Sequence, residues 1–81
     1  MTRLPRGLSV RELVQALRGL GYDVTRQRGS HLRLTTSRSG EHRVTIPAHD
    51  PLKVGTLASI LREVAAHHGL SRDELLRELF P

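Results

Sequence analysis

Apolar residues recur every three or four positions in two stretches of the chain, and this spacing predicts two amphipathic helices. The first covers residues 10–18 and opens with a capping box, in which Ser9 is the N-cap and Glu12 reaches back to it. The same box recurs at Ser71, ahead of a short helix that ends at about Leu79. The starts of the first and last helices are therefore both marked by a capping box.

The second helix is longer, and its end is easier to place than its start. Gly69 interrupts the apolar period after His67-His68, so the helix is expected to end there. Either Asp50, with Pro51 behind it, or Thr56 can serve as its N-cap, and the sequence does not choose between them. Its apolar stripe consists of Leu57, Ile60, Leu61 and Val64.

Three other stretches alternate apolar and polar residues, which is typical of half-buried strands. They are Tyr22–Arg26, Ser30–Thr36 and His42–Ile46, and Pro47 should end the last because it lacks the N–H that a strand ladder needs. The side chains expected to face the core are Tyr22, Val24, Leu32, Leu34, Val44 and Ile46.

The predicted order is α-β-β-β-α with a short C-terminal helix, which is an α+β fold. Short connections favour a three-stranded antiparallel meander, with the helices on its single apolar face and the other face open to solvent. Double-stranded RNA-binding domains have this arrangement, so the expected fold is dsRBD-like. Residues 1–81 are expected to form one domain, led by an extended segment over Met1–Gly7.

The net charge of the chain indicates which kinds of molecule it can bind. Thirteen basic residues, twelve of them arginine, outnumber eight acidic ones, for a net charge of +5. Arginine binds phosphate oxygens in pairs, which favours nucleic acid, although an acidic protein or an arginine-rich but ordinary surface fits as well. Tyr22 and Phe80 are the only aromatic residues, so base stacking can contribute little to RNA binding.

Several classes of site and location are disfavoured. The chain has no cysteine, no apolar run long enough to cross a membrane and no signal-peptide core, so a cytoplasmic protein without membrane contact is expected. Its five histidines lack a carboxylate-rich setting, and neither a metal site nor a cofactor is expected. His42 should face water, and His67 and His68 should be solvated residues at a helix end.

The run Arg26–His31 carries the candidate chemistry. In the following strand Leu32 and Leu34 face the core, so His31 and Arg33 should share the open face. Histidine ordinarily titrates near neutrality and can take and return a proton, so His31 is a candidate for proton transfer. A plain surface histidine in a basic hairpin is the alternative interpretation.

Several spaced motifs together resemble the HicA-type toxins, the small mRNA interferases of HicA–HicB toxin–antitoxin pairs. The resemblance rests on Gly21-Tyr22, Arg26–His31, Pro47-Ala48-His49, Gly55-Thr56-Leu57, Ser59–Arg62 and Ser71–Leu75. It implies a dsRBD-like fold, metal-independent ribonuclease activity on mRNA, growth arrest and neutralisation by a HicB-type antitoxin. It also implies that His31, in the Gly-Ser-His motif, is the catalytic residue.

The candidate RNA contacts surround His31 in this scheme, and the free protein is expected to be a monomer. For His49 a second proton-transfer group, a phosphate contact and a loop-fixing hydrogen bond remain open. A non-catalytic RNA-binding module and a protein that meets an acidic partner are the alternative functions. The candidate RNA-binding residues are Arg26, Arg28, Ser30, Arg33, Arg43 and His49.

Overall fold

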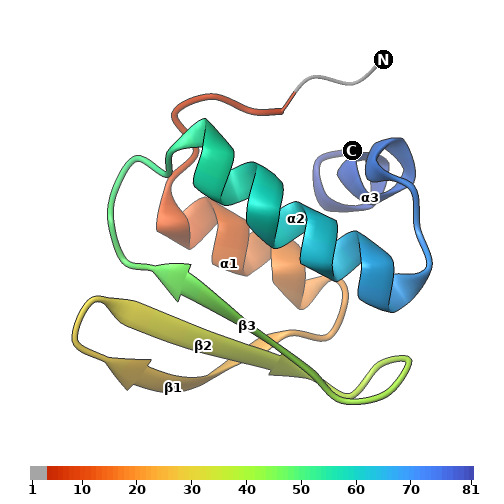
Figure 1. Ribbon diagram of the computed structural model, residues 1–81, viewed down its shortest axis with the longest axis horizontal. Helices are drawn as coiled ribbons and strands as arrows, with labels where there is room; N and C mark the ends of the chain where they lie inside the picture. The colour runs from red at the N-terminus through yellow and green to blue at the C-terminus, as the bar shows by residue number, and fades with distance from the viewer. Residues whose placement is uncertain (1–3) are drawn as a thin grey trace.

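A computed structural model describes residues 4–81 and has the predicted α+β order, α-β-β-β-α followed by a short helix (Figure 1). Met1–Arg3, the start of the predicted lead-in, lie outside the described residues. Within 4–81, no helix combines the length and the hydrophobicity that a membrane span requires. The elements are α1 (Val10–Arg18), β1 (Asp23–Arg28), β2 (His31–Thr36), β3 (His42–Pro47), α2 (Val54–His68) and α3 (Arg72–Leu79).

The three strands form an antiparallel sheet in the order β1-β2-β3, as the short connections predicted. In Figure 1, α1 and α2 lie on one side of the sheet, and α3 lies beyond α2. The core fills the space between sheet and helices; from the strands, Leu34, Val44 and Ile46 are buried there. The opposite face, which we call the open face, is free of helices.

The helix predictions at the two ends of the chain are confirmed in detail. The Ser9 hydroxyl accepts the Glu12 N–H at 3.0 Å, and the Glu12 carboxylate accepts the Ser9 N–H at 3.1 Å. Ser71 and Glu74 form the same pair of hydrogen bonds, which lower the pKa of the Glu74 carboxyl below its ordinary value. Each box pairs two N–H groups that an isolated helix end would leave free.

Both candidate caps for α2 were wrong. The helix begins at Val54, and its N-cap, Lys53, makes no side-chain capping bond. Asp50 instead accepts the N–H of Val10 at 2.6 Å, so it caps α1, forty residues earlier in the chain. Leu52 explains the difference, because its buried side chain and its hydrogen bond to the Leu8 carbonyl hold this loop against the start of α1.

The first strand also differs from the prediction, since it covers Asp23–Arg28 instead of Tyr22–Arg26. Tyr22 is fully buried as expected, but Val24 is 40% exposed. Every residue of β1 is exposed, whereas β3, the other edge strand, buries Val44 and Ile46. Val24 therefore lies on the helix side of the sheet, as the alternation predicted, but the core does not extend as far as β1.

Candidate active site

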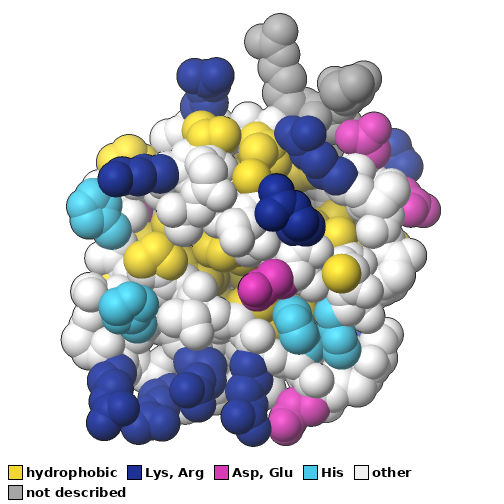
Figure 2. Space-filling view, in the orientation of Figure 1, with side chains coloured by type: hydrophobic (Ala, Val, Ile, Leu, Met, Phe, Trp, Pro, Cys, Tyr) yellow, Lys and Arg dark blue, Asp and Glu magenta, His cyan; other side chains and the backbone are white. Residues whose placement is uncertain are grey.

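Arginine and histidine side chains from two strands line an open hollow of about 210 Å³. Its walls are Arg26, Arg28, His31, Arg33 and Thr45, and we call it the arginine hollow. In Figure 2 basic side chains form a row along the part of the surface that the sheet occupies. The hollow thus places one imidazole among three guanidinium groups.

The pairing of β2 with β3 positions His31, Arg33 and Thr45 in this hollow. Strand alternation puts Leu34 in the core and His31 and Arg33 on the open face. Arg33 lies opposite Thr45, and His31 lies opposite Pro47. Thr45 therefore joins the hollow from the neighbouring strand, as the alternation of β3 permits.

A β-bulge in β1 positions the other two lining residues, Arg26 and Arg28. The register shifts between Val24, opposite Leu34, and Arg26, opposite Arg33, so Thr25 is an extra residue in the strand. Strict alternation would put Arg26 on the same side as Val24, facing the helices. The bulge moves Arg26 and, two residues on, Arg28 to the open face beside His31.

Thr25 is held in this bulge by its own side chain. Its hydroxyl lies 2.8 Å from the Thr35 hydroxyl and donates a longer, 3.4 Å hydrogen bond to the Arg33 carbonyl. Both partners lie on β2, so these bonds tie the bulge to the strand that carries His31. The sequence does not predict the role of Thr25, because nothing in a Thr-Arg-Gln-Arg run distinguishes a bulged strand from a regular one.

The turn between β1 and β2 brings a third segment to the site. Gly29 has a φ of +56°, a conformation that favours glycine, and this allows the two-residue connection between Arg28 and His31. The Ser30 carbonyl then accepts the N–H of Ala48 at 2.6 Å. This bond lays Pro47-Ala48-His49 beside the Gly-Ser-His turn.

Only some of the predicted site residues therefore lie together in the arginine hollow. Arg26, Arg28 and Arg33 line the arginine hollow with His31, whereas Ser30, Arg43 and His49 do not. Arg43 lies farther along the open face, opposite Thr35, where its guanidinium pairs with Glu41 at 3.1 Å. Within residues 4–81 this is the only ion pair, so the arginines of the hollow are not neutralised there.

His49 is exposed just after β3, and the structure gives only its backbone a partner. Its N–H donates to the Pro47 carbonyl at 2.9 Å. Within the described chain the imidazole itself makes no hydrogen bond, so the loop-fixing role considered for the side chain is absent.

Three other histidines, which were expected to face water, are half-buried and form a separate cluster. The rings of His42 and His67 stack with centroids 4.4 Å apart. The buried Tyr22 hydroxyl lies 2.8 Å from Nδ1 of His42 and 3.1 Å from Nε2 of His68. His67 Nε2 lies 3.0 Å from the carbonyls of both Arg38 and Gly40 and donates to them. The cluster joins the end of α2 to the β2–β3 hairpin.

Burial and neighbouring groups lower the pKa of two of these histidines, His42 and His68. Burial, and then the nearby His67, lower the pKa of His42; burial also lowers the pKa of His68, with His67, His42 and Arg38 adding to it. Burial, and then the Glu63 carboxylate, raise the pKa of Tyr22 to about 12. Glu63 partly opposes the shift at His42. At His42 and His68 the folded state therefore favours the neutral imidazole.

We expect the protein to lose stability as the pH falls through about 6.5, the ordinary histidine value. Below it the unfolded chain binds protons that the folded His42 and His68 resist, so the free energy of unfolding decreases. Urea denaturation at pH 7.5 and 5.5 measures this effect. A His42→Gln, His68→Gln double variant should reduce the difference, and greater stability of the unaltered protein at pH 5.5 would contradict the prediction.

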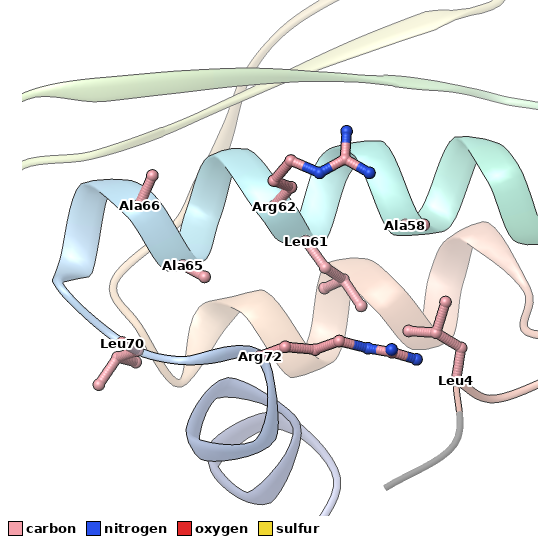
Figure 3. Close-up of a pocket in the computed structure, with 8 residues that line it drawn as sticks. All are labelled: Leu4, Ala58, Leu61, Arg62, Ala65, Ala66, Leu70 and Arg72. Carbon is pink, nitrogen blue, oxygen red and sulfur yellow. The ribbon is translucent and has the colours of Figure 1, made fainter. Parts of the chain in front are cut away.

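A larger hollow, of about 420 Å³, lies on the side of α2 turned away from the sheet (Figure 3). Its lining is apolar except for Arg62 and Arg72. It contains no histidine, hydroxyl or carboxylate, so none of its side chains is suited to take up a proton. The arginine hollow, which holds an exposed histidine among arginines, is therefore preferred to it as the candidate active site.

Comparisons with known proteins identify the family. Residues 10–65 match the family described as "HicA toxin of bacterial toxin-antitoxin", a span that runs from the start of α1 into the second half of α2. Searches of curated proteins and of solved structures gave no match. The matched span contains the whole sheet and every residue of the arginine hollow. The chain thus belongs to the HicA family, the toxins of bacterial toxin–antitoxin systems.

Proposed function

We propose that this toxin is an endoribonuclease that cleaves mRNA without a metal ion, with His31 as the general base. The observation that carries the proposal is the arginine hollow, which places His31 beside Arg26, Arg28 and Arg33. A histidine supplies proton transfer, and guanidinium groups bind a phosphate and stabilise the negative charge that grows during its cleavage. Membership of a toxin family is consistent with an attack on mRNA.

The proposed reaction begins at the ribose 2′-hydroxyl. The His31 imidazole takes its proton, and the 2′-oxygen attacks the adjacent phosphorus. The bond from phosphorus to the 5′-oxygen of the next nucleotide breaks, and that oxygen receives a proton. The products are a 2′,3′-cyclic phosphate and a 5′-hydroxyl end. The arginines balance the extra negative charge on the phosphoryl oxygens while the five-bonded state exists.

The remaining predicted residues are proposed as contacts to the RNA outside the hollow. Ser30 lies in the turn next to His31, and His49 lies on the segment tied to that turn through Ala48. Arg43 extends the basic surface along the open face. His49 is also the candidate for the acid that protonates the departing 5′-oxygen, since its imidazole is exposed.

RNA binding by a His31→Ala form should weaken steeply with salt, because arginine contacts release counterions from the phosphates. Replacing Arg33 with alanine should reduce the slope of log K against log salt by about 0.7, the value for one phosphate contact on a single strand. Fluorescence anisotropy with a labelled RNA oligonucleotide at several salt concentrations measures the slope.

Arg77→Ala is the matched control, because it removes the same charge from an exposed position on α3, away from the sheet. Its slope should match that of the His31→Ala parent. Equal slopes for all three proteins would refute the phosphate contact at Arg33. Salt-sensitive binding by the unaltered protein without any cleavage would favour the alternative, a non-catalytic RNA-binding module.

The antitoxin is proposed to be of the HicB type and to cover the open face. An exposed arginine surface on a domain of charge +5 suits an acidic protein as well as it suits RNA. Arg28 and Arg33 should then support both toxicity and neutralisation. Hydrogen exchange of the complex should protect Arg26–Thr36; protection confined to Leu57–Leu79 would refute occlusion of the active site.

A further inference from the structure

A third hollow, of about 390 Å³, adjoins the arginine hollow. It lies between β3 and the first two-thirds of α2 and is lined by Thr45, Gly55, Thr56, Ser59, Ile60 and Glu63, and we call it the hydroxyl groove. Thr45 lines both hollows, and it sits opposite Arg33 in the sheet. A strand of RNA held by the arginines can therefore continue over Thr45 into this groove.

The chemistry of the hydroxyl groove differs from that of its neighbour. Thr45, Thr56 and Ser59 supply hydroxyls that can donate and accept, and Glu63 supplies a carboxylate that only accepts when ionised. No lysine or arginine lines it, and the carboxylate repels phosphate. In Figure 2 the surface beyond the basic row is largely uncharged, with an acidic side chain near its centre. The groove thus suits a neutral ligand that offers N–H donors.

Gly55 is a residue that the fold does not require. Its φ lies outside the left-handed range, and a Cβ built there meets nothing within 4 Å. Glycine is unfavourable inside a helix relative to alanine, and Gly55 lies in the first turn of α2. Its effect is to leave the floor of the groove open, and it belongs to the Gly-Thr-Leu motif whose role the catalytic proposal leaves unassigned.

We propose that the hydroxyl groove binds a nucleoside next to the scissile phosphate and favours bases with an exocyclic amino group. Glu63 accepts a hydrogen bond from that amino group, as carboxylates do from cytosine N4, and the hydroxyls contact the ribose or the base edge. The volume lies within the range of small-molecule sites, about 300–1,000 Å³. This inference rests on the proposed function, since it assumes that RNA is the substrate.

The first test is binding of nucleotides that the protein cannot cleave. Cytidine and uridine 5′-monophosphates are titrated into ¹⁵N-labelled His31→Ala protein, and amide shifts are followed by NMR. We expect shifts at Gly55, Thr56 and Ser59 that saturate at about fivefold lower concentration for the cytidine than for the uridine nucleotide, the lower end of a base-reading contact.

Two variants sharpen the test. Gly55→Leu fills the groove and should abolish these shifts without lowering the melting temperature, whereas Ala66→Leu, at an exposed position on α2 outside the groove, should leave them unchanged. Glu63→Gln should remove the preference for the cytidine nucleotide, because an amide can also donate to a uracil carbonyl.

The outcomes separate the subsite from the proposed function. Shifts confined to Arg26–Arg33, equal responses to both nucleotides or unchanged binding in Gly55→Leu would each overturn the nucleoside subsite, whether or not the protein cleaves RNA. Groove shifts with the expected preference would support the subsite even for a protein that lacks nuclease activity, a result that would overturn the proposed function alone.

Discussion

A His31→Ala protein should lose RNA cleavage by a factor on the order of 10²–10⁴, because that is the typical contribution of a general base. The loss should be larger if His31 also returns the proton to the leaving oxygen. Cleavage rates on a labelled RNA and growth after induction in a bacterium are the two measurements. Growth arrest by the unaltered chain should disappear in the variant.

The control for this experiment is the stability of the His31→Ala protein, which must remain folded. His31 is exposed on the open face, and its side chain makes no hydrogen bond within the described residues, so the substitution should change the free energy of unfolding by no more than about 0.5 kcal/mol. Thermal unfolding of both proteins measures this. Full growth arrest by a folded His31→Ala protein would refute the catalytic role.

A Leu57→Ala protein should be about 2–5 kcal/mol less stable, a large part of what so small a domain possesses. Leu57 is fully buried on the face of α2 that contributes to the core. The loss has two sources, the apolar area returned to water and the cavity left behind. For a domain of this size it should lower the melting temperature by about 10 °C or more.

Arg62→Ala is the comparison for Leu57→Ala, since Arg62 lies on the same helix but is exposed. Its free energy of unfolding should stay within about 0.5 kcal/mol of the unaltered protein. If Leu57→Ala melted at the same temperature as Arg62→Ala, the buried stripe of α2 would contribute nothing to stability.

Local chemistry explains which parts of the fold the sequence predicts. The capping boxes at Ser9 and Ser71 act within four residues, so the starts of α1 and α3 are visible in the sequence itself. Gly69 ends α2 with a φ of +66°, again a local preference. Alternation in the same way predicts the inward face of β3.

The failures come from contacts between distant residues. Asp50 caps α1 because Leu52 holds its loop against that helix, which the local sequence around Asp50 does not reveal. His42 and His68 meet at Tyr22 from two elements, so each resembles an ordinary surface histidine when considered alone. The half-buried setting that these two histidines share at Tyr22 exists only after the sheet and α2 have packed together.

For the same reason, the sequence predicts only part of the candidate site. The Gly-Ser-His turn and the alternation of β2 place His31 and Arg33 together from sequence alone. The bulge at Thr25, which turns Arg26 and Arg28 to the same face, depends on bonds to the neighbouring strand. Arg43 appeared equivalent in the alternating pattern, but it lies two register positions beyond Thr45 and pairs with Glu41.

The chemical nature of the cut RNA ends tests most directly whether His31 activates the ribose 2′-hydroxyl. RNA is incubated with the unaltered protein and, in parallel, with His31→Ala protein purified in the same way, and the new ends are identified by mass spectrometry. The proposed mechanism predicts 2′,3′-cyclic phosphate and 5′-hydroxyl ends from the unaltered protein and none from the variant. New ends carrying a 3′-hydroxyl and a 5′-phosphate, or cyclic phosphates formed equally by both proteins, would contradict it.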